Sequence, residues 1–247
     1  MSPLGSARHV IVVGAAALSA AAGLVDAQAQ NPSKIFGWDG GDRFGAAVAI
    51  PGDVDGDGLV DVLVGDPREG VTGAEPGGVQ LFSGRTGEVL VQVTGAAPLD
   101  RFGTAVSRVG DVDGDGLADW AVGAPGSDAT GLNAGRAQVF SGQTGALLMT
   151  LDLGVVGDAF GSALSGGFDL DLDGVGDLVV GAPYADRLAA NDGAAWVVST
   201  RTGTVLHVLD GPATGAAYGG AVAWLGDADG DGLPDLAVGA PFDPSGG

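Results

Sequence analysis

The sequence predicts an all-β fold of the β-propeller class, built from four-stranded blades. One pattern returns four times, because aromatic-glycine pairs begin at residues 44, 102, 160 and 218, which are 58 residues apart. A regular period of this order is typical of repeat architectures, in which each unit packs on its neighbours. Short apolar runs alternate with glycine- and proline-rich turns, and helical periodicity is absent after residue 30. We expect three complete blades and a partial fourth, which leaves the ring incomplete.

Each unit should contain four strands, described here for the first unit. Residues 46–50 are small or β-branched, which suits a closely packed inner strand. Residues 62–65 are continuously apolar, as expected for a strand buried on both faces, and Pro67 ends it because proline cannot donate to a sheet. Residues 79–82 and 88–93 flank a glycine-rich turn, which predicts a hairpin. Four such antiparallel strands make one propeller blade.

The aromatic residue that opens each unit is expected to pack between adjacent blades, although a role in stacking on a ligand is the alternative. These residues are Phe44, Phe102, Phe160 and Tyr218. Trp120 occupies the phase held by Val62, Leu178 and Leu236 in the other units, so we expect it in the core.

Residues 1–29 are expected to be a signal peptide. Arg8 and His9 precede an apolar run over residues 10–25, and Ala27-Gln28-Ala29 matches the small-residue cleavage pattern. The run is shorter than the roughly 20 residues of a membrane span, and a retained anchor helix is the alternative. Residues 30–247 should form one repeat array. Its units are 44–101, 102–159, 160–217 and the partial 218–247.

The charge of the chain restricts its partners. The formal net charge is −21, from 31 acidic and 10 basic residues. Nucleic acid requires a basic patch, so it is not expected as a partner. Membrane insertion after signal cleavage is not expected either, because no later segment is long and apolar enough to span a bilayer. The chain contains no cysteine, so something other than disulfides must hold an exported fold, and repeated packing and metal binding are the candidates.

An aspartate cluster follows each aromatic-glycine pair by nine residues. Positions 1, 3, 5 and 9 of the cluster are aspartate, and alternate residues in a tight loop can turn several oxygens toward one centre. Calcium takes six to eight such ligands. The candidate ligands are Asp53, Asp55, Asp57, Asp61, Asp111, Asp113, Asp115, Asp119, Asp169, Asp171, Asp173, Asp177, Asp227, Asp229, Asp231 and Asp235. Position 7 could add a backbone carbonyl, and its apolar side chain should point inward. This position holds Leu59, Leu117, Val175 and Leu233.

The ligand types favour calcium, with up to four ions. Zinc and copper prefer nitrogen and sulfur, and His207, the histidine outside the signal segment, lies outside the loops. Magnesium retains its waters, and an EF-hand requires glutamate at position 12, where the first loop holds Val64. A solvated acidic turn that binds nothing is the alternative. The third loop departs from the pattern, since Leu172 replaces the position-4 glycine.

These motifs together resemble the FG-GAP repeat of integrin α-subunit propellers and of secreted bacterial proteins. The matching features are Phe-Gly, Asp-x-Asp-Gly-Asp-Gly-x-x-Asp and Gly-Ala-Pro, and the resemblance covers about residues 34–247. It implies calcium loops between the first and second strands of each blade, and roles in adhesion or protein binding. The family closes a fuller ring, and Lys34–Phe36 is a candidate strand for another blade. Because no Arg-Gly-Asp motif is present, integrin-type ligand recognition cannot be carried over.

We therefore expect a non-enzymatic, calcium-binding propeller that is secreted or on the cell surface and serves adhesion or protein interaction. Its partner would be an extracellular protein or a glycan, and partial rings could self-assemble. An accessory propeller of a larger, phospholipase-like secreted enzyme is one alternative, and a glycan-binding module is another. The chain lacks a Gly-x-Ser-x-Gly elbow, and His207 lies on a predicted outer strand, which disfavours catalysis.

Overall fold

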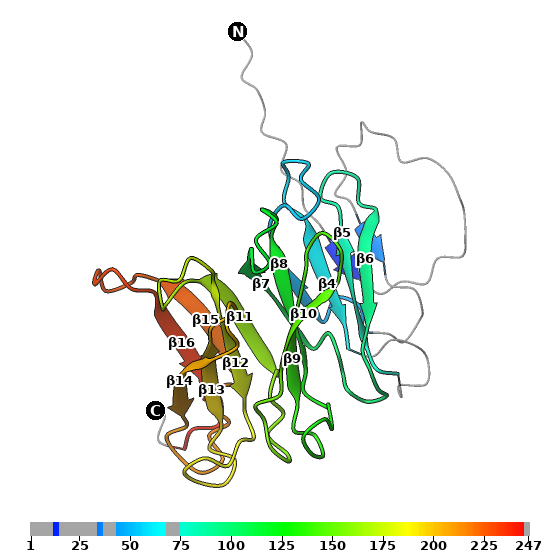
Figure 1. The fold of residues 1–247 in the computed structure, drawn as a ribbon. Helices are drawn as coiled ribbons and strands as arrows, with labels where there is room; N and C mark the ends of the chain where they lie inside the picture. Colours follow the sequence, from blue (N-terminus) through cyan, green and yellow to red (C-terminus); the bar gives the residue numbers. More distant parts are fainter. Residues whose placement is uncertain (1–11, 15–33, 37–42, 68–74, 245–247) are drawn as a thin grey trace.

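The structure, a computed structural model, describes residues 12–14, 34–36, 43–67 and 75–244, and these residues contain strands and turns but no helix. Three four-stranded antiparallel sheets and one two-stranded sheet follow one another along the chain (Figure 1). The first blade holds β3 (Ala47–Ala49), β4 (Val62–Asp66), β5 (Gly78–Phe82) and β6 (Val89–Thr94). The second holds β7 (Ala105–Gly110), β8 (Asp119–Ala124), β9 (Arg136–Phe140) and β10 (Leu147–Leu151). The third holds β11 (Ala163–Phe168), β12 (Asp177–Ala182), β13 (Ala194–Val198) and β14 (Val205–Asp210), and the partial fourth holds β15 (Ala221–Gly226) and β16 (Asp235–Gly239).

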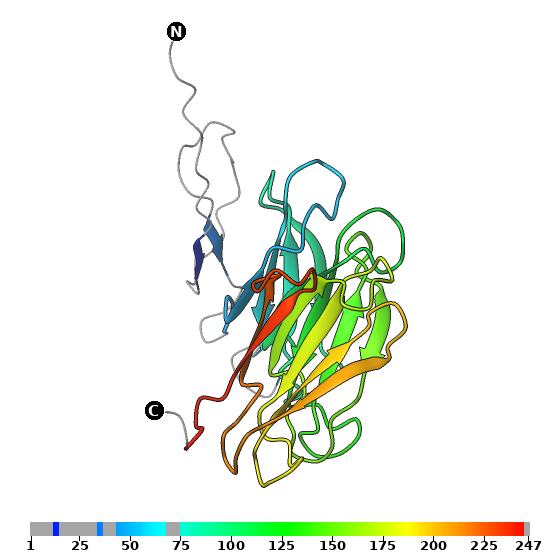
Figure 2. The ribbon, with the colours of Figure 1, turned by 90° about the vertical axis from the view of Figure 1, so that its left-hand side faces the viewer.

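The blades are arranged as the repeat predicts. Within each sheet the strands lie in chain order, and each first strand contacts the first strand of the next blade: β3 with β7, β7 with β11, and β11 with β15. The described sheets do not close into a ring, and the contacts of the inner strands place the fourth sheet, orange to red and nearest the viewer in Figure 2, at the end of the row. The expected propeller with three complete blades and a partial fourth is confirmed.

The N-terminal segment forms a separate strand pair. The strand expected at residues 34–36 is present as β2 (Lys34–Phe36), and it pairs in parallel with β1 (Val12–Gly14). It pairs with no strand of the four described blades, so the structure does not support its assignment as a strand of another blade. The other residues of the predicted signal peptide, 1–11 and 15–29, lie outside the described residues.

The core lies within and between the sheets. Every residue of β4, β8 and β12 is buried, as their continuous apolar runs predict. Phe102, which opens the second unit, is fully buried in a cluster that includes Leu63 of the first blade and Val122 of the second. Trp120 is also fully buried and stacks on Phe140 with ring centroids 4.7 Å apart. Both aromatic residues therefore have the packing roles predicted for them.

Adjacent blades meet through their backbones. The Phe102 N–H donates to Pro76 O of the preceding blade at 2.9 Å, and Gly77 and Phe102 form a parallel β-bridge. A Cβ atom on Gly65 would overlap the carbonyl oxygen of Gly103 in the next blade. The same overlap would arise at the next two joints, from Gly123 against Gly161 and from Gly181 against Gly219. The glycine of the Gly-Ala-Pro motif is thus required by close approach rather than by backbone conformation.

Serine hydroxyls add side-chain hydrogen bonds between the inner strands of adjacent blades. Ser107 Oγ accepts a hydrogen bond from Gly166 N at 2.9 Å, and Ser165 Oγ accepts one from Trp224 N at 3.0 Å. In the first blade the same phase holds Ala49, which offers no hydroxyl. Two of the three joints therefore carry a side-chain hydrogen bond between blades, worth about 1 kcal/mol each.

The close approach predicts a sharp difference between two glycines of the same motif. Gly123→Ala should lower the free energy of unfolding by about 3 kcal/mol, because the new methyl group overlaps a backbone carbonyl that cannot easily move. Urea unfolding followed by circular dichroism measures this change.

Gly239→Ala is the matched control. Its Cβ would lie 3.5 Å from Ala221 Cβ, an ordinary contact, because none of the described blades packs against this glycine. This variant should be neutral or slightly more stable, since alanine restricts the unfolded chain. Equal destabilisation by the two substitutions would contradict the backbone-contact explanation.

Candidate metal centres

The four acidic loops lie at the same end of the sheets, uppermost in Figure 1. Each connects the inner strand of a blade to the second strand, as between β7 and β8. The inner strands enter these loops and the second strands return from them, because each pair is antiparallel. The position predicted for the loops is therefore confirmed.

In every loop three carboxylate side chains place oxygen atoms within 4.8 Å of one another. These groups are Asp53, Asp55 and Asp57; Asp111, Asp113 and Asp115; Asp169, Asp171 and Asp177; and Asp227, Asp229 and Asp235. Each predicted set of four aspartates thus contributes three to a group. The remaining member is position 9 in the first two loops and position 5 in the last two.

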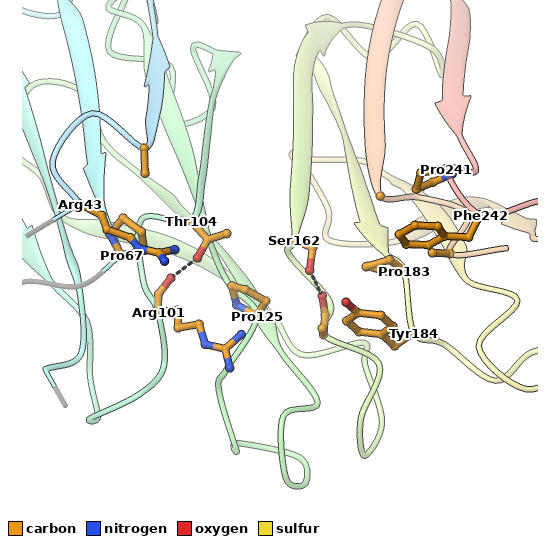
Figure 3. A pocket seen from close by; sticks show the side chains of 14 residues that line it. Arg43, Pro67, Arg101, Thr104, Pro125, Ser162, Pro183, Tyr184, Pro241 and Phe242 are labelled. Atoms are coloured by element: carbon orange, nitrogen blue, oxygen red, sulfur yellow. Dashed lines mark hydrogen bonds between the residues drawn. The ribbon is translucent and has the colours of Figure 1, made fainter. Parts of the chain in front are cut away.

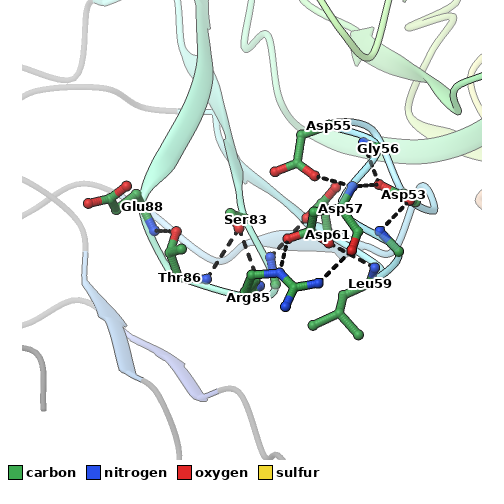
Figure 4. A network of polar contacts seen from close by, with 12 residues as sticks. Asp53, Asp55, Gly56, Asp57, Leu59, Asp61, Ser83, Arg85, Thr86 and Glu88 are labelled. Carbon is green, nitrogen blue, oxygen red and sulfur yellow. Dashed lines mark hydrogen bonds and ion pairs between the residues drawn. The ribbon is translucent and has the colours of Figure 1, made fainter. Parts of the chain in front are cut away.

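Backbone N–H groups of the loop orient these carboxylates. Asp53 accepts hydrogen bonds from Gly56 N at 2.7 Å and from Gly58 N at 2.8 Å (Figure 4). Asp55 and Asp57 each accept from the N–H two residues further on, at 3.0 and 2.8 Å. Gly58 has a φ of 86°, which fits the predicted backbone reversal at position 6. Successive short-range bonds therefore turn alternate side chains toward one centre.

The position-9 aspartate fastens the loop to the hairpin turn of its own blade. Asp61 is fully buried, and its Oδ2 and Oδ1 accept from Val54 N and Gly84 N, both at 2.8 Å. Asp119 makes the equivalent bonds in the second blade. Burial raises the pKa of both carboxyls, and these backbone bonds partly oppose that rise. Each carboxylate oxygen retains a lone pair for a cation, because one hydrogen bond does not exhaust it.

The third loop contains an oxygen that nothing in the described chain satisfies. Thr200 stands where the other turns have glycine, and Asp177 Oδ1 has no hydrogen-bond partner among the described residues. Burial raises the pKa of Asp177 to about 6. Leu172, which replaces the position-4 glycine, has a φ of 60° and keeps the same left-handed turn. A buried, unpartnered carboxylate oxygen fits a hard cation, so the donor set of this loop suits calcium.

Arginine reaches the acidic loop from the adjacent hairpin turn, a feature that the sequence reasoning missed. Arg85 Nε donates to Asp57 Oδ2 at 2.7 Å, and this hydrogen bond lowers the pKa of Asp57 (Figure 4). Arg201 stands at the same turn position in the third blade, with its Nε 3.7 Å from Asp173 Oδ2. The signal was available, because both arginines occupy the third place of a Ser-x-x-Thr-Gly turn.

The apolar side chain at position 7 does not generally point inward, so this prediction is wrong for two loops. Leu59 is 45% exposed and Leu233 is 43% exposed, whereas Val175 is buried. The reason is that position 2 fills the interior, as Val54 does in the first loop with 1% exposure. Leu117 is half-buried and faces Gly56 of the neighbouring loop.

The raised pKa values predict how metal-free protein responds to pH. The folded state holds the proton on Asp61, Asp119 and Asp177 more tightly than the unfolded chain, where such carboxyls titrate near 3.8. The free energy of unfolding should therefore rise as the pH falls from 7 toward 4. The contribution of Asp177 to this rise should occur between about pH 6 and pH 3.8. Denaturant unfolding at several pH values measures this slope.

One variant and two other carboxyls serve as controls for this pH dependence. Asp177→Asn should remove part of the slope, because its side chain does not titrate. Asp57 and Asp192, whose pKa values are lowered, titrate below 3.8 and leave the window unaffected. A metal-free protein that loses stability between pH 7 and 5 would contradict the burial of these carboxyls.

Sheets joined in a row, with an acidic loop in each at one end, define the class as a repeat β-propeller. The FG-GAP repeat family model matches residues 102–140 and 160–198. Human integrin alpha-IIb is 37% identical over 181 residues, which is 67% of this chain and 17% of the integrin. Integrin alpha pat-2 of Caenorhabditis briggsae is 32% identical over 226 residues, 81% of this chain and 18% of that protein. The chain is an FG-GAP repeat protein of integrin α-like sequence, and it spans less than a fifth of these relatives.

Among solved structures, the exotype rhamnogalacturonan lyase YesX is similar, with a TM-score of 0.47 and 23% identity over 78% of this chain and 38% of the lyase. The rhamnogalacturonan lyase of Bacillus licheniformis has the same TM-score and 21% identity, over 78% of this chain and 39% of the lyase. The described residues include no helix long and apolar enough to cross a membrane.

Proposed function

We propose that this protein is an extracellular, calcium-stabilised propeller that acts as a non-enzymatic adhesion or protein-interaction module. The observation that carries the proposal is the set of four in-phase acidic loops at one end of an integrin α-like propeller. Proteins that bind by their loops use a rigid scaffold to present them, and the joined sheets supply one.

The role proposed for calcium is structural. In each loop, three carboxylates within 4.8 Å repel one another when no cation neutralises them. A bound calcium ion would supply positive charge at that centre. The residues proposed to hold it are the aspartates at positions 1, 3, 5 and 9 and the carbonyl at position 7. Oxygen donors alone, without nitrogen or sulfur, support calcium over zinc.

Binding at these loops would stabilise the folded protein by mass action. Each site adds about 2.7 kcal/mol when free calcium is one hundred times its dissociation constant. Thermal unfolding in millimolar calcium and again in excess chelator should therefore show a sharp drop in the transition temperature on chelation. A calcium-insensitive transition would mean that the loops are acidic turns without an ion.

A loop variant tests which residues bind. Asp113→Asn should reduce the calcium stoichiometry by one, because Asp113 belongs to the carboxylate group of the second loop alone. Equilibrium dialysis with radioactive calcium measures the stoichiometry, and the other loops serve as internal references.

Asp152→Asn is the matched control. Asp152 pairs with Arg136 away from the acidic loops, so its loss should leave the stoichiometry unchanged. It should also alter stability little, because partly exposed ion pairs contribute about 0–1 kcal/mol. An unchanged ion count in Asp113→Asn would overturn the ligand assignment.

A further inference from the structure

A cavity of about 630 Å³ opens at the end of the sheets opposite the acidic loops. All four blades line it with the same three positions: the residue before Phe-Gly, the residue after it, and the proline that ends the second strand. In the second blade these are Arg101, Thr104 and Pro125. Cavities of about 300–1,000 Å³ are typical of small-ligand sites.

The cavity is cationic on one side. Arg43 and Arg101, from the first and second blades, both line it, and its described lining includes no acidic side chain. Neither guanidinium forms an ion pair within the described chain, and both residues are exposed. Asp66 lies close by, buried, and accepts the backbone N–H of Arg43 at 3.1 Å. Two arginines without an ion-pair partner among the described residues favour an anionic group in a chain of net charge −21, and the guanidinium fork matches a carboxylate.

The opposite side of the cavity is aromatic. Tyr184 and Phe242 follow the strand-ending prolines of the third and fourth blades and face the arginines across the cavity (Figure 3). These two residues are 53% and 70% exposed, although backbone hydrogen bonds hold their main chains in place. Tyr184 N donates to Asp158 O at 3.3 Å, and Phe242 N donates to Ala216 O at 3.2 Å. These rings offer an apolar surface to a ligand without a large entropic cost.

Two hydroxyl groups lie between these two sides, and each already donates its proton to a backbone carbonyl. Thr104 Oγ1 donates to Arg101 O and Ser162 Oγ donates to Ala159 O, both at 2.7 Å (Figure 3). Each oxygen retains lone pairs and can only accept a further hydrogen bond in this arrangement. The cavity therefore suits a ligand that brings hydroxyl donors together with a carboxylate and an apolar face.

We propose that this cavity binds a short acidic saccharide. Its carboxylate would pair with Arg43 and Arg101, its hydroxyls would donate to Thr104 and Ser162, and a ring face would lie on Tyr184 or Phe242. The assignment rests on the proposed function, because it names the ligand class of the binding module. It places that ligand at the end of the propeller opposite the acidic loops, where calcium does not bridge it.

Isothermal titration calorimetry of the calcium-loaded protein tests the assignment. Trigalacturonate is the probe, galactotriose is the neutral saccharide of equal length, and hexaglutamate is the acidic peptide. Protein and ligand solutions share the same calcium concentration, so that injection does not dilute the calcium. Trigalacturonate should bind saturably and at least about tenfold more tightly than galactotriose, because only its carboxylates can form charge-assisted hydrogen bonds with the arginines.

Variants locate the binding. Arg43→Gln and Arg101→Gln should each weaken trigalacturonate binding by about tenfold, and Tyr184→Ala should weaken it by about fivefold. Arg201→Gln removes the same charge at the acidic-loop end and should leave the affinity unchanged. The arginine residues are exposed, so unaltered thermal transitions should confirm that these variants fold.

Three outcomes would overturn the proposal: no saturable trigalacturonate binding, equal binding by Arg101→Gln and the unaltered protein, or tighter binding of hexaglutamate than of the saccharide. The calcium-dependent melt distinguishes this failure from failure of the proposed function. A protein that is stabilised by calcium but does not bind the saccharide would retain the first proposal and lose the second.

Discussion

The fold depends on the close approach of adjacent blades, in which backbone meets backbone. The Phe-Gly of one blade lies against the Gly-Ala-Pro glycine of the blade before it, and a Cβ on Gly65, Gly123 or Gly181 would overlap a carbonyl. This contact brings Phe102 and its counterparts into the space between sheets, where they bury apolar area. It also places the inner strand of each blade beside the inner strand of the next, so the same packing recurs at each joint of the array.

Two sets of hydrogen bonds to aspartate and serine side chains complete that arrangement without disulfides. Buried Asp61 and Asp119 each join an acidic loop to a hairpin turn, which ties the first and second strands of a blade to the third and fourth. Ser107 and Ser165 join one inner strand to the next. The aspartate bonds therefore join the strands of one blade at its acidic-loop end, and the serine bonds join neighbouring blades along their inner strands. Both sets of bonds use backbone N–H groups that burial would otherwise leave unpaired.

The two ends of the sheets have opposite chemistry. Sixteen aspartates lie in the loops at one end, while Arg43 and Arg101 line the cavity at the other. Because antiparallel strands alternate direction, loops of one kind always emerge at one end and the Phe-Gly turns at the other. This separation by the length of the strands would allow the proposed calcium-stabilised scaffold and the proposed anion-binding cavity to coexist in one acidic chain, because ions in solution screen charges at that distance.

The repeated motifs by themselves determined the blades, the four strands of each complete blade, the end at which the acidic loops lie, and the burial of Phe102 and Trp120, because these depend on local patterns that recur. Tertiary structure decided the rest. The exposure of Leu59, the unpartnered oxygen of Asp177 and the pairing of Lys34–Phe36 with Val12–Gly14 depend on neighbours that no local pattern specifies. The cavity likewise exists only because packing brings together residues from four units, each 58 positions apart in the sequence.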